Sequence, residues 1–415
     1  MRWYHGWNVL TVTVLFQGIL IGSTSSSFTL LITEWSREFH AGVGDLQITI
    51  LIFTAVQCLL APIPGTFIDR TSIRAMIITG TVLAATGMAL LSMVDAVWQI
   101  VAVYGAFISP GVLLAGLLPA QTLAVKWFRG RRGLAIGLST AGASIGGMVM
   151  PIIVTQLVLA FGWRDAHLIL AAVAVVLIVP AVWFVVRNSP EQMGIEPEPE
   201  SDISAARAAA RVFPKWTIVQ ILRERTFWVM VASLVPMAMA LAAVAQNIGP
   251  LARQVGVSPM NAAFLVSLFS GCALLSKILC GMTADRVDLR VLFWVTNSLL
   301  TLGLLLFATQ PVYPLMLLAA VMLGLGGGAF LPLLASLIST RFGPQSFGRV
   351  MSMFGPATII TGTGPWIAGR IRDSTGDFSL ALNVFLVILV PAMLAMLLLK
   401  PLAPAQPQPK LAPGE

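Results

Sequence analysis

Long runs of apolar residues recur along nearly the whole of this 415-residue chain. Ile77–Met93, Trp98–Val125 and Leu168–Val186 are three of them. At about 1.5 Å of rise per residue, each run is long enough as a helix to cross the roughly 30 Å hydrocarbon core of a bilayer. Only 10% of the residues are charged and the mean hydropathy is +0.90, so a soluble fold would expose apolar surface that it could not cover. The sequence therefore predicts an all-α membrane protein.

Charges and Gly/Pro clusters divide the apolar sequence into twelve predicted transmembrane helices. These helices cover residues 7–32, 45–68, 76–94, 98–125, 133–160, 165–186, 226–252, 260–283, 290–309, 312–340, 348–369 and 379–399. The first run is longer than the core of a secretion signal and equal runs follow it, so it is interpreted as a transmembrane helix.

One long hydrophilic stretch, rich in Pro and Glu, separates the first six predicted helices from the last six. We expect a six-helix bundle over residues 1–187, a cytoplasmic linker over 188–224 and a second six-helix bundle over 225–400. The Pro-rich residues 401–415 are expected to form a disordered cytoplasmic tail.

The distribution of positive charge predicts the orientation of the chain. Nineteen of the 25 Lys and Arg residues fall on the side of the predicted membrane that carries both termini. Loops rich in Lys and Arg stay in the cytoplasm, so both termini are predicted to be cytoplasmic. This distribution also accounts for the formal net charge of +8 without a nucleic-acid partner.

A charged motif occurs once in each half of the chain. Gly65–Arg74 and Gly281–Arg290 both fit G-x-x-x-D-R-x-x-x-R, and each follows the second helix of its half. Further residues match at a similar offset: Phe128 with Phe342, Pro151 with Pro365, and Gly162 with Gly376. A small residue allows two helices to approach, and the acid and base at a cytoplasmic helix end can pair with a neighbouring helix. The repeat indicates two related halves.

With this repeat the chain resembles the major facilitator superfamily, in which the loop between helices 2 and 3 carries the motif and the second half often repeats it. The resemblance implies twelve helices in two six-helix pseudo-repeats that rock about a site between them. It implies a gating role for six charged residues, namely Asp69, Arg70, Arg74, Asp285, Arg286 and Arg290. The family pattern usually has Gly where Ser72 and Asp288 stand here.

Further segments are similar to those of bacterial relatives of the monocarboxylate transporters, a branch that includes oxalate/formate exchangers. They are Tyr4–Trp7, Lys126–Ala135, Gly162–Arg164 and Ser189–Gly194. The resemblance implies a secondary transporter of the bacterial inner (plasma) membrane, and we expect it to act as a monomer in the lipid bilayer.

Lys277 is the one basic residue inside a predicted span. It lies eight residues before Asp285, so about 12 Å of helix separates it from the cytoplasmic end. A charge at that depth is costly and marks a functional site, unless the side chain snorkels to the interface. Monocarboxylate transporters place a substrate-binding Arg in helix 8 four residues before a Gly, and Lys277 stands four residues before Gly281. The resemblance thus implies that Lys277 binds substrate.

Two differences from the families that the chain resembles affect how substrate transport would be coupled to a proton or to a counter-anion. Ala273 stands where proton-coupled animal members have Asp, and helix 11 offers only Thr358, Thr361 and Thr363 where the exchangers have a second cation. All seventeen acids fall in loops or at helix ends. Our hypothesis is therefore a small monocarboxylate substrate, moved by alternating access in exchange for a counter-anion or together with a proton. The alternative is an exporter of drugs or other neutral compounds.

Four amide side chains on predicted helices 1, 4 and 7 are candidates for the substrate cavity, because these helices face the cavity in the resembling superfamily. They are Gln17, Gln121, Gln246 and Asn247. Each can equally hold two helices together by an interhelical hydrogen bond.

No enzymatic, metal or cofactor site is predicted. His5, His40 and His167 are scattered, without metal-ligand spacing and without partners for nucleophilic catalysis. The glycines of Gly142–Gly147 and Gly324–Gly328 have GxxxG spacing, which predicts close helix contact, with a mobile bend as the alternative.

Overall fold

Helices form nearly all of the computed structural model. The structure describes residues 4–61, 72–128, 132–195, 216–284, 287–343 and 346–399, and no β-strand occurs within these ranges. The first half contains α1 (Gly6–Ile21), η1 (Gly22–Ser26), α2 (Phe28–Glu38), α3 (Val43–Leu60), α5 (Ile73–Leu91), α6 (Val97–Val103), η2 (Tyr104–Ile108), α7 (Ser109–Leu114), α8 (Leu117–Trp127), α9 (Arg132–Val185) and η3 (Pro190–Met193).

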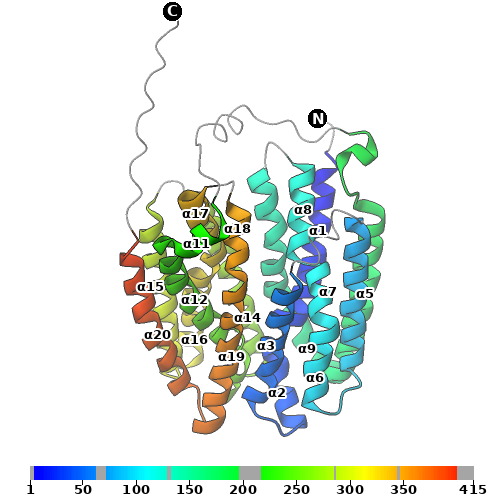
Figure 1. Cartoon of the computed structure of the whole chain (residues 1–415). Coiled ribbons are helices and arrows are strands. Elements are labelled where there is room, and N and C mark those ends of the chain that lie inside the picture. The colour runs from blue at the N-terminus through cyan, green and yellow to red at the C-terminus, as the bar shows by residue number, and fades with distance from the viewer. Residues whose placement is uncertain are drawn as a thin grey trace, which may run out of the picture.

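The second half has the same kind of organisation. It contains α11 (Ile218–Arg223), α12 (Arg225–Ala245), α13 (Ile248–Gln254), α14 (Pro259–Thr283), α15 (Leu289–Ala308), α16 (Tyr313–Gly328), α17 (Phe330–Phe342), α18 (Phe347–Met353), α19 (Gly355–Thr375) and α20 (Ser379–Leu397). In Figure 1 the two halves stand side by side, the first in blue to green and the second in green to red.

Ten helical segments of the described chain are long and apolar enough to cross a membrane. One of them, Leu134–Val185, has 52 residues and would be about 78 Å long if straight, more than twice the hydrocarbon thickness. It turns back at Gly162, where φ is 82°, and so crosses twice. α19 has sufficient length but is rich in Gly and Thr and is not one of the ten. With Leu134–Val185 counted as two spans and α19 counted as one, the described chain crosses the membrane twelve times, as predicted.

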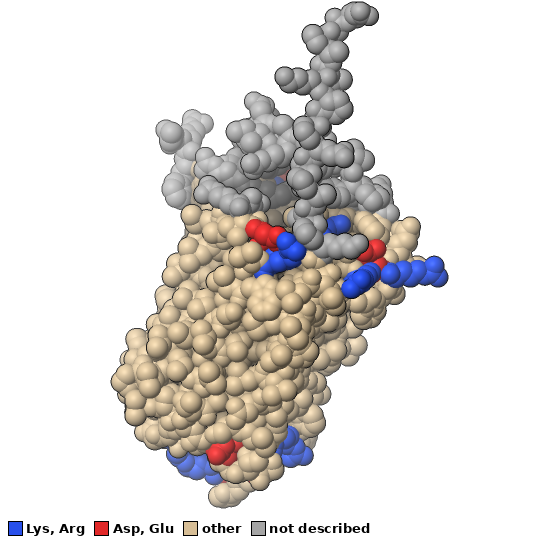
Figure 2. Space-filling view, turned by 90° about the vertical axis from the view of Figure 1, so that its left-hand side faces the viewer, with Lys and Arg blue, Asp and Glu red and all other residues tan. Residues whose placement is uncertain are grey.

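The surface has the charge distribution of a membrane-spanning protein. Figure 2 shows Lys, Arg, Asp and Glu side chains gathered at the two ends of the molecule, with a broad uncharged band between them. Large apolar side chains are exposed in the middle of the long helices, among them Val295, Leu302 and Val387. Exposing such side chains to water costs free energy, whereas contact with lipid tails does not, so the band corresponds to the bilayer.

Two ends of the molecule must be distinguished. We call the face at which α1 begins and α20 ends the terminal face (Figure 1). At the opposite face α2 connects to α3, and α19 connects to α20. Between the two halves, α3 packs along α19 and α9 packs along α14.

The internal repeat has a structural basis. Gly162 and Gly376 lie where the chain reverses direction between two spans, and both have a positive φ, of 82° and 90°. Such backbone is readily adopted only by glycine. Ser72 and Asp288, which depart from the family motif, occupy equivalent N-cap positions: Ser72 accepts from the Ala75 amide and Asp288 from the Arg290 amide. The departures therefore serve to cap a helix.

The glycine-rich segments lie in close helix contacts, as predicted. A Cβ at Gly146 would overlap the Gly18 backbone of α1, and one at Gly142 would lie 2.8 Å from Val14 Cα. In α16, a Cβ at Gly324 would lie 2.5 Å from the carbonyl oxygen of Phe269 on α14. Only glycine permits this approach of the backbones.

Candidate functional site

The two halves are joined at the opposite face by a carboxylate. Asp373, near the end of α19, accepts hydrogen bonds from the backbone amides of Val43 (3.0 Å) and Gly44 (2.7 Å) at the start of α3. Amides at a helix N-terminus have no partner within the helix and carry partial positive charge, so a carboxylate stabilises them. Asp373 thus caps a helix of the other half.

An ion pair and a close backbone contact lie beside this cap. Arg370 pairs with Asp45 across the halves at 3.0 Å. A Cβ at Gly369 would lie 2.7 Å from Gly44 Cα, so α3 and α19 touch backbone to backbone at this point. The halves are therefore in direct contact at the opposite face.

Polar contacts deeper in the same interface involve two of the predicted site residues. Gln47 Nε2 of α3 donates to the Gln246 carbonyl (2.7 Å) and to Asn247 Oδ1 (3.0 Å), at the break between α12 and α13. Nearby, the Gly249 amide donates to Thr29 Oγ1 at 2.9 Å. Gln246 and Asn247 therefore join the halves in this conformation, as the interhelical alternative allowed. We call these contacts between the halves the opposite-face gate. They are made by Thr29, Val43, Gly44, Asp45 and Gln47 of the first half and by Gln246, Asn247, Gly249, Gly369, Arg370 and Asp373 of the second.

Lys277 lies in the other interface between the halves, that of α9 with α14. Its Nζ donates to Ser144 Oγ at 2.6 Å, across the two halves. No Asp or Glu of the described chain lies within 4.0 Å of this ammonium. Because a serine hydroxyl is neutral, the positive charge has a hydrogen-bond acceptor but no counter-charge.

The contact between α9 and α14 ends next to Lys277. On the side toward the opposite face, a Cβ at Gly147 would lie 2.7 Å from Ser270 Oγ of α14. On the side toward the terminal face, Gly281 follows Lys277 by one turn and Gly137 precedes Ser144 by about two turns. Neither has an atom of a neighbouring helix within 4 Å of its Cβ position. Lys277 thus lies where the facing surfaces separate toward the terminal face.

The other two predicted amides differ in their surroundings. Gln17 is fully buried, and its Nε2 donates to the Ser139 carbonyl, so it joins α1 to α9. Gln121 of α8 is half-buried and makes no hydrogen bond within the described chain. Within the described chain, neither of them is hydrogen-bonded to Lys277.

Two of the six predicted gating residues can be placed. The Arg74 guanidinium lies 4.8 Å from the ring centroid of Trp183, at the end of the sixth span. Arg290 Nη1 donates to the Leu399 carbonyl (3.3 Å), at the end of the twelfth span. Hydrogen bonds from Arg290 hold the pKa of the Asp288 carboxyl below its ordinary value. Both arginines therefore contact their own half. The other four lie outside the described residues: Asp69, Arg70, Asp285 and Arg286.

The residues at the family positions for proton coupling and for a second cation have ordinary structural surroundings. Ala273 packs against Gly328 of α16. The hydroxyls of Thr358, Thr361 and Thr363 donate to carbonyls of their own helical turns. Among the described residues at these family positions, Lys277 is therefore the charged one.

Of the gate residues, Gln246 and Asn247 are among the predicted site residues, but the charged ones, Asp45, Arg370 and Asp373, are not. In the sequence they are charged residues of helix ends and external segments like many others. A partial signal existed, because α19 combines three charged residues with many glycines, which is unusual for a lipid-facing helix.

Comparisons with known proteins agree with this architecture. Residues 14–250 and 232–415 match the model of the Major Facilitator Superfamily. The chain is similar to Monocarboxylate transporter 2 of Mesocricetus auratus, with 24% identity over 389 residues that cover 90% of this chain and 80% of that protein. Monocarboxylate transporter 12 of Homo sapiens is 25% identical over 405 residues, covering 91% and 77%.

A solved structure is similar in fold. The crystal structure of a bacterial homologue of the human lysosomal transporter Spinster, in an inward-facing and unoccupied conformation, gives a TM-score of 0.72. It is 14% identical in sequence, and the match covers 96% of this chain and 97% of that one.

Proposed function

Since the chain belongs to the major facilitator superfamily and is a multi-pass membrane transporter, we propose that its substrate is a small organic anion, most simply a monocarboxylate. The observation that carries the proposal is Lys277, a cation in a membrane span with no carboxylate of the described chain within 4.0 Å. An unpaired charge in a span is costly, and a substrate carboxylate supplies the missing counter-charge.

The position of Lys277 fits a site between the rocking halves. It extends from α14 of the second half and contacts Ser144 of the first half. A carboxylate arriving from the terminal face reaches the ammonium where the facing surfaces separate. It accepts a hydrogen bond from Nζ in place of Ser144 Oγ, because a charged acceptor is stronger than a neutral hydroxyl. The contact between the halves at Lys277 is thereby exchanged for a contact with substrate.

Transport then proceeds by alternating access. In the conformation described here the opposite-face gate is closed. To release substrate on that side, the contacts of Asp373 and Arg370 must break while the terminal ends of the halves come together. We assign the latches of that second conformation to the two repeated motifs, whose Arg74 and Arg290 contact their own halves in the part of the chain that the structure describes.

We further propose that the terminal face is cytoplasmic and that the membrane is a bacterial inner membrane. The Lys and Arg distribution supports this orientation. The conformation is then open inward and closed outward. No acid lies within the middle of a described span. Coupling therefore takes the form of exchange for another anion, or of a proton carried by the substrate or by Lys277.

Similarity to the monocarboxylate transporters supports a carboxylate substrate, since the matches span about nine-tenths of the chain. Lysine in place of a planar guanidinium attracts a carboxylate but orients it less strictly. A single cation also suits a monoanion better than a dianion.

Counterflow in proteoliposomes tests the proposal. Vesicles loaded with unlabelled pyruvate are placed in trace labelled pyruvate, and the panel is repeated with lactate, formate, oxalate and the neutral amide of lactate. We expect counterflow with monoanions, weaker counterflow with oxalate and none with the amide. Equal counterflow with the amide, or with neutral drugs but no carboxylate, would instead support the exporter alternative.

A further inference from the structure

Arg253 is the exception among five arginines at the opposite face. The other four each pair with a carboxylate: Arg37 with Glu34, Arg164 with Glu38 and Asp95, Arg370 with Asp45, and Arg372 with Asp373. Within the described ranges, the hydrogen bond of the Arg253 guanidinium goes to the Val257 carbonyl, at 3.0 Å. No Asp or Glu of the described chain lies within 4.0 Å of its guanidinium. One positive charge at this face is therefore left without a counter-charge.

Arg253 borders a cavity between the halves. The cavity has a volume of about 270 Å³ and is lined by α2 and α3 of the first half and by α13 and α19 of the second. Two further arginines line it, Arg37 from α2 and Arg372 from α19. This space is large enough for a small anion with part of its hydration shell. We call this cavity the arginine pocket.

Three buried polar atoms of the pocket-lining residues have no hydrogen-bond partner among the residues that the structure describes. They are Arg372 Nε, Gln254 Oε1 and Thr33 Oγ1. Buried polar atoms are nearly always hydrogen-bonded, so the lining gains hydrogen bonds when these side chains turn toward a bound anion. Arg372 Nε and Thr33 Oγ1 can then donate to it, whereas Gln254 Oε1 only accepts.

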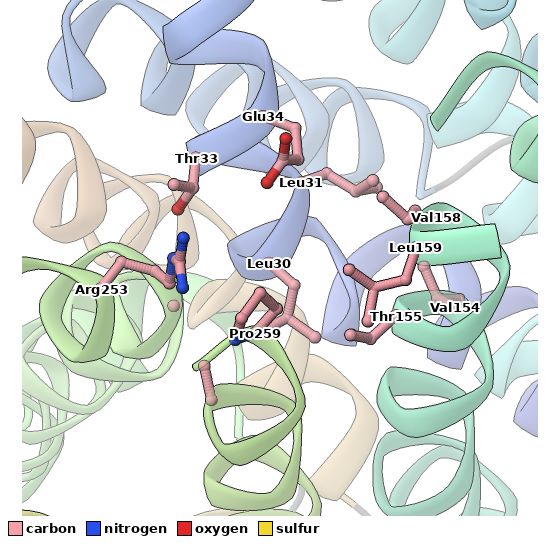
Figure 3. Close-up of a pocket in the computed structure, with 12 residues that line it drawn as sticks. Leu30, Leu31, Thr33, Glu34, Val154, Thr155, Val158, Leu159, Arg253 and Pro259 are labelled. Carbon is pink, nitrogen blue, oxygen red and sulfur yellow. The ribbon is translucent and has the colours of Figure 1, made fainter. Parts of the chain in front are cut away.

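The surroundings of Arg253 add an apolar component. Figure 3 shows its side chain reaching from α13 toward Thr33 of α2. Leu30 and Pro259 lie between it and Val154 and Leu159 of α9, on the far side of a neighbouring pocket. Glu34 also lines that neighbouring pocket, but its carboxylate pairs with Arg37. An anion held by Arg253 therefore has apolar side chains beside it, which suits a short-chain carboxylate.

We propose that the arginine pocket binds a small soluble oxyanion, such as a carboxylate or sulfate, and that the bound anion holds the opposite-face gate closed. Arg37 belongs to one half and Arg253 and Arg372 to the other, so opening the gate takes the pocket apart. A ligand that binds only the closed state favours that state by the factor 1 + [L]/Kd. With the opposite face external, as proposed above, abundant external anion slows outward opening and thus slows uptake.

A buried cysteine reports on the gate. Thr29 is 1% exposed, contacts Gly249 across the halves and does not line the pocket. In a parent with Cys58, Cys272 and Cys280 replaced by alanine, Thr29→Cys is labelled from outside by a membrane-impermeant maleimide only when the gate opens. Sodium sulfate is compared with sodium chloride at equal ionic strength. At ten times its Kd, sulfate should slow labelling about elevenfold.

Three variants locate the effect. Arg253→Gln should abolish protection by sulfate, whereas Arg164→Gln, an arginine of the same face outside the pocket, should retain it. Lys277→Ala should also retain it, because the proposed substrate site is separate. Protection that persists in Arg253→Gln, or that is lost in Lys277→Ala, overturns the pocket proposal. The second outcome would place sulfate at Lys277 and leave the proposed transport function standing.

The membrane composition distinguishes a soluble anion from a lipid headgroup. In phosphatidylcholine vesicles we expect fast labelling without sulfate and slow labelling with it. Slow labelling in vesicles containing phosphatidylglycerol without any sulfate, reversed by Arg253→Gln, would show that a lipid phosphate occupies the pocket and would overturn the assignment to a soluble anion.

Discussion

Replacing Asp373 by alanine is expected to open the opposite-face gate. The carboxylate accepts from the amides of Val43 and Gly44, at 3.0 and 2.7 Å, and both bonds cross between the halves. They cannot persist when α3 and α19 separate. Their loss therefore destabilises the closed state and leaves the open state nearly unchanged.

The size of the effect follows from the type of bond. A hydrogen bond to a charged group contributes about 1.5–3 kcal/mol. The Asp373 side chain is 20% exposed and also pairs with Arg372 of its own helix, so water and the neighbouring charge reduce the net loss. About 2 kcal/mol is a reasonable value, which changes the closed-to-open ratio about thirtyfold.

Labelling of Thr29→Cys by an impermeant maleimide measures this ratio. While the gate is mostly closed and opens rapidly, the labelling rate is proportional to the open population. We therefore expect labelling about thirtyfold faster in Asp373→Ala than in the parent, at the free-energy difference given above.

Asp377→Ala is the matched control. Asp377 lies four residues further along, and its carboxylate accepts from the Ser379 amide of its own half, at 2.8 Å. Its removal should leave the labelling rate within about twofold of the parent, since it makes no contact between the halves. An unchanged rate in Asp373→Ala, or an equal acceleration in Asp377→Ala, would refute the assignment of Asp373 to the gate.

Three further predictions concern the gate, the helix packing and the helix cap. Arg370→Asp should speed Thr29→Cys labelling by about two- to fivefold, since the Asp45 pair is about half exposed, and adding Asp45→Arg should restore the parent rate; lack of any restoration argues against a direct pair. Gly146→Ala should lower the thermal unfolding temperature in detergent, because its Cβ overlaps the Gly18 backbone, whereas Gly137→Ala, which has open space, should leave it unchanged or raise it; equal effects would contradict the packing account. The lowered pKa of Asp288 stabilises the folded state above the pKa of the unfolded chain, and this contribution is lost as pH falls through the lower folded value. Asp288→Asn should therefore flatten the acid limb of thermal stability in detergent, and an unaltered limb would count against it.

Much of the fold is predictable from the sequence because a bilayer leaves few options. Backbone groups in lipid must be paired within the protein, which leaves helices and closed β-barrels, and apolar runs of about 20 residues have the length of a spanning helix rather than of a strand. The reversal at Gly162 also follows from the sequence, since it lies between predicted spans and matches Gly376 in the repeat. Lys277 was identified because one charge in an apolar run is conspicuous whatever its neighbours.

The contacts between the halves could not be predicted in the same way. Asp373 and Gly44 are 329 residues apart, so no local pattern in the sequence relates them. The helical periodicity of a span does not determine the direction of a side chain where the helix breaks. Asn247 lies at such a break, and its side chain contacts Gln47 and the Pro365 carbonyl. Nothing in the sequence distinguishes Arg253 from other arginines between spans, since whether a charge has a partner is visible only in three dimensions.

In the proposed mechanism, the Lys277 ammonium binds the carboxylate of the substrate. Equilibrium binding of a labelled monocarboxylate that supports counterflow, measured on purified protein, tests it directly in the wild type, Lys277→Arg and Lys277→Gln. Loss of a hydrogen bond to a charged group, at about 1.5–3 kcal/mol, predicts about 10- to 150-fold weaker binding in Lys277→Gln. Lys277→Arg should retain most of the affinity. Wild-type affinity in a folded Lys277→Gln variant would contradict the account.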